Sequence, residues 1–253
     1  PAASDYLSPP NQVMFVNTRY RSKETEIMDD FSLQGDMLRQ TLDQIARINK
    51  RLGGNKATLG GLDTILQTIP TSNVIRIADL GCGSGDMLRA IADYGRKNKY
   101  RLALTGIDNN DFTVNYARKC SAGYPEIRYV KMDVLSEAFR EQEFDITVAT
   151  LFLHHFDDEQ IGRLLNELVT RNRIGLVIND LHRSNMAYYL FRFISLFIRN
   201  PMVRNDGAIS VLRGFKKKEL EAFHNALTNT TSTIRWKWAF RYQWIIRKYE
   251  RTN

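Results

Sequence analysis

The sequence predicts an α/β fold built on a parallel, doubly wound sheet. Short apolar runs alternate with amphipathic stretches between residues 74 and 180, the order expected when helices connect parallel strands. The first run leads directly into a glycine-rich turn at residues 81–85. Polar residues collect where the runs end, at the edge of such a sheet where ligands bind. We therefore expect a small-ligand site at that edge.

Length and composition limit the class of protein. The chain has 253 residues, of which 43% are hydrophobic, enough for one large domain or a core domain with an appendage. Cys82 and Cys120 have neither metal-ligand spacing nor a disulfide framework, which favours a reducing compartment such as the cytoplasm. No apolar stretch reaches the roughly 18 residues of a membrane span, and no signal-peptide pattern is present. A soluble protein is expected.

Positive charge is in excess but scattered. The net charge is +8, and the densest clusters, at residues 96–99, 216–218 and 247–248, are short. This distribution favours a solvated surface over a nucleic-acid site. Weak steering of an anionic substrate and transient contact with a membrane surface stay open as alternatives.

The first 69 residues are predicted to form a helical cap. Residues 1–21 are expected to be coil, and apolar residues recur at helical spacing from Ser22 to Leu52, before Gly53 and Gly54. A further short helix is expected over residues 59–69, closed by Pro70. The cap is either a lid over the site or a packing appendage, and we favour the lid.

Five strands are expected in the central part, at residues 74–80, 102–108, 127–133, 144–150 and 174–180. Helices follow them, one over residues 111–119 and another opened by the capping pair Asp157 and Gln160. The polar residues at the strand ends are Asp79, Asp108, Asp133, Thr150, His154, His155, Asp180 and His182.

The pattern changes after Asp180. Residues 187–198 form a helix that is apolar on almost every face, which is typical of buried core. An acceptor pocket, a homodimer contact and insertion into a membrane surface are the alternatives. Residues 204–214 are expected to be a polar loop, with a helix near residues 220–227 and two closing strands between 234 and 248. We treat residues 182–214 as an insertion that forms the acceptor pocket.

The glycine turn carries a family resemblance. The run Asp79-Leu80-Gly81-Cys82-Gly83-Ser84-Gly85 resembles the first motif of class I S-adenosylmethionine (SAM)-dependent methyltransferases of the small-molecule type, which include quinone and phenol methyltransferases. Its second and third glycines are one residue closer together than in dinucleotide-binding turns. The resemblance covers roughly residues 70–250. It implies a seven-stranded sheet whose last strand is antiparallel to the others.

The resemblance also implies residue roles. Asp108 would accept hydrogen bonds from the ribose hydroxyls, and Asp133 would bind the adenine amino group between Met132 and Val134. The alternative for both acids is a helix cap. The full set of expected SAM-binding residues is Asp79, Gly81, Cys82, Gly83, Gly85, Asp108, Asn109, Met132, Asp133, Val134, Thr150 and His155.

The histidine pair suggests the acceptor chemistry. The stretch from Leu153 to Glu159 resembles plant-type O-methyltransferases, in which a histidine deprotonates a phenol, and His154 is the matching position. An imidazole suits that role because it titrates near neutral pH. His182 is a second candidate base. Alternatively, His154 or His155 contacts the cofactor or packs in the core.

These features predict O-methylation of a small aromatic or polyketide-like acceptor, as in secondary metabolism. The alternatives are a quinone or lipid C-methyltransferase and a non-catalytic SAM-binding protein. The sequence after Thr150 lacks the Asn/Asp-Pro-Pro-aromatic motif of nucleobase methyltransferases, so we expect no nucleic-acid substrate. Thr150 and the order Asn179-Asp180 depart from metal-dependent catechol methyltransferases, so we expect no metal.

Overall fold

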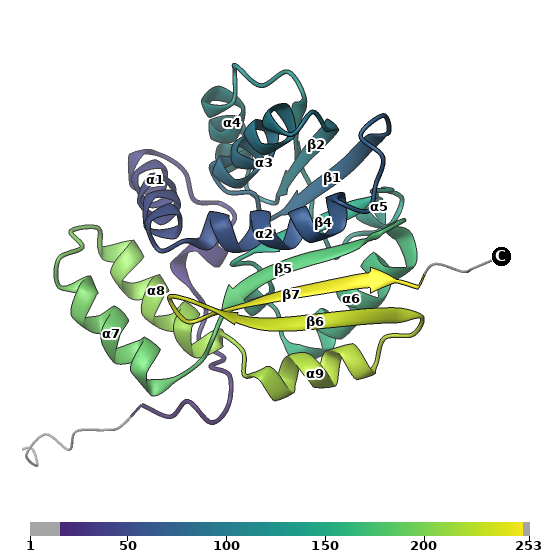
Figure 1. Ribbon diagram of the computed structural model, residues 1–253. Helices are drawn as coiled ribbons and strands as arrows, with labels where there is room; N and C mark the ends of the chain where they lie inside the picture. Colours follow the sequence, from purple (N-terminus) through teal and green to yellow (C-terminus); the bar gives the residue numbers. More distant parts are fainter. Residues whose placement is uncertain (1–15, 250–253) are drawn as a thin grey trace, which may run out of the picture.

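A single seven-stranded sheet forms the centre of the molecule (Figure 1). The computed structural model describes residues 16–249, so the coil expected for residues 1–15 lies outside the described part. The strand order is β3-β2-β1-β4-β5-β7-β6. β7 (Arg241–Lys248) pairs antiparallel with both β5 and β6, while the other pairs are parallel. The predicted fold class is confirmed, including the antiparallel last strand.

The N-terminal part is helical, as predicted, but its boundaries differ. A 3-10 turn, η1 (Ile27–Asp29), precedes α1 (Asp36–Arg51). The next helix, α2 (Gly54–Leu66), begins five residues earlier than the predicted start at Leu59, because Gly53 in the left-handed region lets the chain turn at once into a new helix. The double glycine therefore ends one helix and starts the next.

The central elements follow the predicted order closely. Strands and helices alternate as β1 (Val74–Leu80), α3 (Asp86–Lys97), β2 (Arg101–Asp108), α4 (Asp111–Cys120), β3 (Ile127–Lys131), α5 (Glu137–Arg140), β4 (Ile146–Thr150), η2 (Leu153–His155), α6 (Asp158–Arg171) and β5 (Gly175–Leu181). The predicted capping pair is present, since Asp157 and Gln160 bond each other's backbone amides at the start of α6.

Two hydrophobic cores cover the two faces of the sheet. Alternate residues of β1 point to opposite faces, so Ile75 and Ile77 join α2, α3 and α4 in one core, while Ala78 and Leu80 join α6 and α9 in the other. Burial on both faces explains why the strand is a continuous apolar run in the sequence.

The C-terminal part consists of α7 (Asn185–Ser195), α8 (Pro201–Arg213), α9 (Lys217–Asn225), β6 (Thr230–Lys237) and β7. The polar loop predicted for residues 204–214 is wrong, because α8 covers most of it. Asn200 caps α8 and Pro201 occupies its first turn. The buried face of α8 includes the polar residues Asp206 and Arg213, which make polar contacts there. The helix therefore lacks the apolar stripe by which it could be predicted from the sequence.

The second correction concerns α7, for which burial in the core was favoured. Its side chains at Met186, Phe193 and Ile194 are exposed, as are Leu196 and Phe197 just beyond it. Among its residues only Ala187 and Ser195 are buried. α7 contacts mainly α8, and the two helices lie with α1 at the end of the sheet where the parallel strands finish (Figure 1).

None of the helices within residues 16–249 is both long enough and apolar enough to span a bilayer. Both cysteines are free, with Cys82 buried and Cys120 exposed.

Candidate active site

The glycine turn links β1 to α3 and needs its glycines. Gly81, Gly83 and Gly85 have φ angles of 63°, 51° and 74°, in the left-handed region that other residues avoid. A Cβ on Gly81 would lie 2.2 Å from the ring of Phe152, and one on Gly85 would lie 2.0 Å from the hydroxyl of Tyr129. The turn therefore holds its shape only with glycine at these positions.

Asp108 ends β2 beside this turn. Its carboxylate accepts hydrogen bonds from the backbone amides of Gly83, at 3.2 Å, and Asn110, at 3.1 Å. Burial raises the pKa of Asp108 despite these bonds. Asp133, by contrast, is exposed and accepts a bond from the Leu135 amide within its own loop.

Three acids, Asp79, Asp86 and Asp108, lie close together at the turn. Asp79 is 2% exposed. Burial raises its pKa well above the usual range, and the neighbouring Asp86 and Asp108 add to the rise. A cationic group bound here would relieve that repulsion. The sulfonium and ammonium groups of SAM are such cations, so these residues fit that cofactor.

One large cavity, of about 1090 Å³, connects the glycine turn to the histidine pair. Every predicted SAM-binding residue except Gly85 lines it, as do both candidate bases, His154 and His182. Apolar side chains from the C-terminal part form another portion of its wall, namely Leu190, Phe191, Ile194, Trp236, Trp238 and Phe240.

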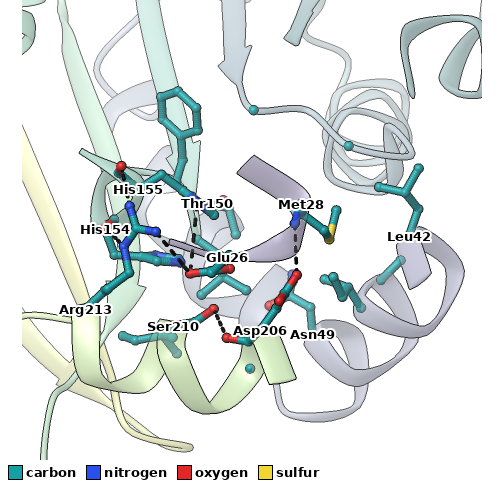
Figure 2. Close-up of a pocket in the computed structure, with 18 of the residues that line it drawn as sticks. Glu26, Met28, Leu42, Asn49, Thr150, His154, His155, Asp206, Ser210 and Arg213 are labelled. Atoms are coloured by element: carbon teal, nitrogen blue, oxygen red, sulfur yellow. Dashed lines mark hydrogen bonds and ion pairs between the residues drawn. The ribbon is translucent and has the colours of Figure 1, made fainter. Parts of the chain in front are cut away.

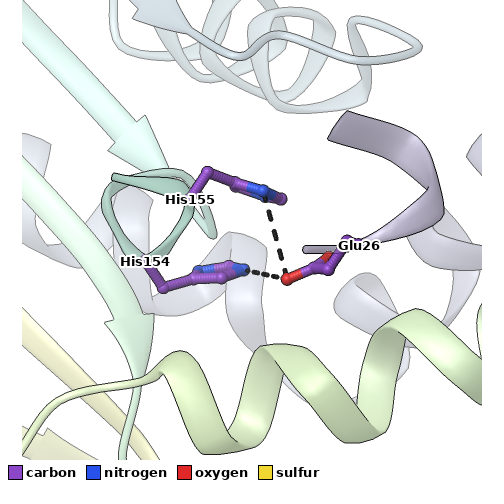
Figure 3. A group of neighbouring side chains, drawn as sticks. All are labelled: Glu26, His154 and His155. Carbon is purple, nitrogen blue, oxygen red and sulfur yellow. Dashed lines mark ion pairs between the residues drawn. The ribbon is translucent and has the colours of Figure 1, made fainter. Parts of the chain in front are cut away.

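His154 lines this cavity and lies between two carboxylates, Asp180 and Glu26, of which Figures 2 and 3 show Glu26. Its Nδ1 is 2.7 Å from Oδ1 of Asp180, and its Nε2 is 3.5 Å from Oε1 of Glu26. Burial opposes the charged ring, but the two acids outweigh burial and raise the pKa of His154 to about 9. The raised pKa favours the imidazolium form, which has no acceptor nitrogen with which to act as a base.

His155 has a different environment. Its Nδ1 is 2.6 Å from Oδ1 of Asp29, and Arg213 donates to the other oxygen of Asp29 at 2.6 Å. The ring stacks obliquely on His154 with centroids 4.3 Å apart. The side chain of His155 is 26% exposed, against 2% for His154. His155 is therefore the more accessible imidazole of the pair.

The second candidate base, His182, lies after β5 on another wall of the cavity. Trp236 donates to its Nδ1 at 3.3 Å. Burial and the nearby cations Arg183 and Lys216 lower its pKa. The structure thus separates the two candidate bases, because the pKa of His154 is raised and that of His182 is lowered.

The N-terminal segment supplies acids that sequence reasoning missed. Asp206 of α8 accepts bonds from the amides of Ile27, at 2.9 Å, and Met28, at 3.0 Å, and so fixes η1 over the cavity (Figure 2). This places Glu26 and Asp29 against the histidines. The only signal in the sequence was a cluster of acids before α1, which is common on protein surfaces.

Arg213 ties the same segment to the histidine loop. Its guanidinium donates to the backbone carbonyl of His154 at 2.9 Å and to that of His155, as well as to Asp29. No local pattern marks Asp206 or Arg213 as part of a site, because each looks like an isolated polar residue in a loop.

Three side chains also have the spacing of a possible metal-ligand set. Glu26, His154 and His155 each place one ligand atom within 4.8 Å of the others (Figure 3). Arg213 Nη1 lies 4.0 Å from the same Glu26 oxygen, and the imidazolium of His154 faces it. These cations already balance the Glu26 charge, so the arrangement fits an ion-pair network better than a metal site.

Similarity to known proteins agrees with this geometry. Residues 77–173 match the family model of a methyltransferase domain. Residues 77–173 are thus a methyltransferase domain, and the sheet topology and the glycine turn agree with the class I fold of methyltransferases that bind SAM.

Individual relatives are distant. O-methyltransferase 2 of Dictyostelium discoideum is 24% identical over 176 residues, which are 66% of this chain and 48% of the relative. The chain thus spans about half the length of that curated relative.

Solved structures share the fold. The plantazolicin methyltransferase BpumL in complex with S-adenosylhomocysteine (SAH) has a TM-score of 0.65 at 13% identity, covering 83% of this chain and 90% of that one. The magnesium protoporphyrin IX methyltransferase ChlM of Synechocystis PCC 6803, with bound SAM, has a TM-score of 0.53 at 10% identity, covering 81% and 84%.

Proposed function

We propose that the chain transfers a methyl group from SAM to a hydroxyl of a small aromatic or polyketide-like acceptor. The observation that carries this proposal is the single cavity shared by the glycine turn, the histidines and an apolar wall. A cofactor and an apolar acceptor can therefore meet in one continuous space. The name of the Dictyostelium relative supports oxygen as the methylated atom.

SAM, held by the glycine turn and Asp108, would supply an electrophilic methyl group to the acceptor oxygen, with SAH as the leaving group. The protein's contribution is then to orient the acceptor, exclude water and accept the hydroxyl proton. The aromatic and aliphatic wall from α7 and the β6–β7 hairpin suits the first two tasks.

For the proton, we favour His155 over the His154 expected from the sequence. When Nδ1–H donates to Asp29, the unprotonated nitrogen of His155 is Nε2, which can accept a proton. His154 would act as a buried cation that fixes Glu26 and Asp180. The other predicted SAM-binding residues keep their proposed roles.

The N-terminal segment through α2 is proposed to act as a cap over the bound molecules. η1 and α1 line the cavity and are joined to the rest by polar contacts, such as those of Asp206 and of Asn110, whose side-chain amide donates to the carbonyls of Phe31 and Leu33, and by the buried side chains of Leu38 and Leu42. Opening of the cap would break these polar contacts and expose the backbone amides of the segment to water.

The test is methyl transfer from isotope-labelled SAM into a small-molecule extract of cells that express the protein. The proposal expects label in an apolar product whose new methyl group has the chemical shift of a methoxy group. Label on carbon or nitrogen, or no incorporation while SAH binds, contradicts it.

A second candidate function is methylation of a quinone or lipid taken from a membrane surface. It is favoured by the exposed apolar side chains of α7, because Leu190 and Ile194 of that helix also border the cavity. Exposed Arg192 and Arg199 flank them and would face anionic lipid headgroups.

Co-sedimentation with phosphatidylglycerol vesicles separates the two functions. The lipid function expects binding that falls for Phe193→Ser and Phe197→Ser and is weaker with phosphatidylcholine. Tyr249→Ser is the matched control, since Tyr249 is an exposed aromatic residue at the opposite end of the sheet. If the protein does not bind vesicles, or if all three variants bind them equally, the lipid function is contradicted and methylation of a soluble acceptor is retained.

A further inference from the structure

Arg241 is a buried cation for which the described part of the chain supplies no acceptor. It begins β7 opposite Leu181 of β5, at the edge of the sheet where the cavity lies. The residue is 3% exposed. Within residues 16–249, neither Nε nor Nη1 has a hydrogen-bond partner, and no carboxylate lies within ion-pair distance of its guanidinium.

The other buried arginines show how unusual this is. Arg183 pairs with Glu219 and donates to backbone carbonyls, and Arg213 pairs with Asp29. For Arg241, burial lowers the pKa to about 10, and only the field of Asp180 opposes that fall. Asp180 itself bonds His154 and the amide of Leu181. A buried charge without a partner is costly, so a site of this kind points to a ligand that completes it.

The neighbourhood of Arg241 is suited to an anion. A Cβ on Gly54 would lie 3.1 Å from Nη1 of Arg241, so the guanidinium sits against the first residue of α2. The cap residue of α2, Gly53, offers no side-chain acceptor to the first amides of this 13-residue helix. The positive end of α2 therefore lies beside Arg241 and adds positive potential there.

An acceptor for a cation lies beside this anion site. Oδ1 of Asn49 is buried without a hydrogen-bond donor in the described part of the chain, and the same Cβ on Gly54 would lie 1.8 Å from it. Asn49 also donates to Asn55, and Asn55 donates to Asp86, so a carboxylate lies close to this acceptor. A ligand with both a carboxylate and an ammonium group would match the site, because the carboxylate could bind Arg241 and the ammonium could donate to Asn49.

A short network connects this site to the cofactor end of β4. Thr150 shares a hydrogen bond of 2.8 Å with Thr58, and Asn179 donates to Thr58 and to the carbonyl of Gly54, each at 3.0 Å. Thr150, Asn49 and Arg241 all line the cavity that also contains the glycine turn, so the network and Arg241 belong to one region.

We propose that Arg241, together with the N-terminus of α2, binds the carboxylate of the methionine moiety of SAM, with Asn49 accepting from its ammonium. This proposal rests on SAM being the cofactor. It assigns to Arg241 a ligand-binding role outside the glycine turn, within the same cavity.

The test compares SAH with S-adenosyl-3-thiopropylamine, which is SAH without its carboxylate, by isothermal titration. Wild type should bind SAH at least about tenfold more tightly, the loss expected when a buried charge pair is broken. Arg241→Gln should weaken the binding of SAH to a similar degree. It should leave the binding of the decarboxylated compound unchanged. Arg235→Gln, which removes an exposed arginine from the same hairpin, should change neither.

Thermal unfolding without ligand separates binding from folding. Because Arg241 has no partner among the described residues, Arg241→Gln should keep or raise the melting temperature. The proposal is overturned if Arg241→Gln binds SAH as tightly as wild type does. It is also overturned if the variant has a lower melting temperature and binds both compounds more weakly to the same degree. If wild type binds neither compound, the cofactor assignment itself fails.

Discussion

Nδ1 of His154 lies 2.7 Å from Oδ1 of Asp180, and both side chains are 2% exposed. This ion pair makes the histidine loop depend on pH. The pKa of His154 is raised from 6.5 to about 9. A raised histidine pKa contributes stability that is fully present below about pH 6.5 and is lost as the pH rises to about 9.

The first prediction concerns stability against pH. In wild type, the free energy of unfolding should fall by roughly 2–4 kcal/mol between pH 6 and pH 10, because one pKa unit corresponds to about 1.4 kcal/mol. His154→Gln should be less stable at pH 6 and lose much of this slope. Urea unfolding at both pH values provides the measurement, and an unchanged slope in the variant would mean that His154 is neutral when folded.

The second prediction separates the two histidines. His155→Gln should lower kcat by about 10²–10⁴-fold, the range for loss of a general base, while SAH binding changes little. His154→Gln should act mainly through stability. The readouts are turnover under saturating SAM and SAH titration. Should His154→Gln remove turnover with normal stability and His155→Gln leave it intact, the base is His154 after all.

The third prediction concerns the glycine turn. Gly81→Ala should abolish SAH binding or folding, because φ is 63° and a Cβ would lie 2.2 Å from Phe152. Gly162→Ala is the control. Gly162 lies within α6, and a Cβ added there would meet open space, so alanine should stabilise the fold by about 1 kcal/mol through helix propensity. Equal behaviour of the two variants would contradict a strained turn.

The fourth prediction concerns the cap. Asp206→Ala removes the acceptor of the Ile27 and Met28 amides, so residues 26–33 should exchange their amide hydrogens faster. SAH should slow exchange there in wild type. Exchange that is equal in variant and wild type, with and without SAH, would show that the segment is a fixed appendage.

The fifth prediction concerns metal. Chelation with EDTA should leave turnover unchanged, since Arg213 and the His154 imidazolium already balance Glu26. Activity that falls after chelation and returns with zinc would assign the three residues to a metal centre instead.

Local sequence was enough to predict the half of the site that binds the cofactor. The strand, glycine turn and helix from Val74 to Lys97 are contiguous, so their apolar pattern and glycine spacing determine the structure directly. The acids at strand ends could be placed for the same reason, because parallel strands finish at one edge.

The catalytic half could not be predicted in the same way. Asp29 and His155 are 126 residues apart, and only the folded chain brings them together. α8 escaped prediction because Asp206 and Arg213 are buried by polar contacts, which breaks the apolar pattern. The exposure of Phe193 depends on what packs against α7, and periodicity carries no information about that.

The most direct test of the central account is a titration of SAH into wild type and Asp108→Ala. Asp108 lies beside the glycine turn, where the ribose hydroxyls are expected, whereas the exposed Asp111 is three residues further on and serves as the control. The account predicts binding to wild type and Asp111→Ala, weakened at least about tenfold in Asp108→Ala, as expected for lost hydrogen bonds to a charged group. No binding to wild type, or equal binding to all three proteins, would contradict it.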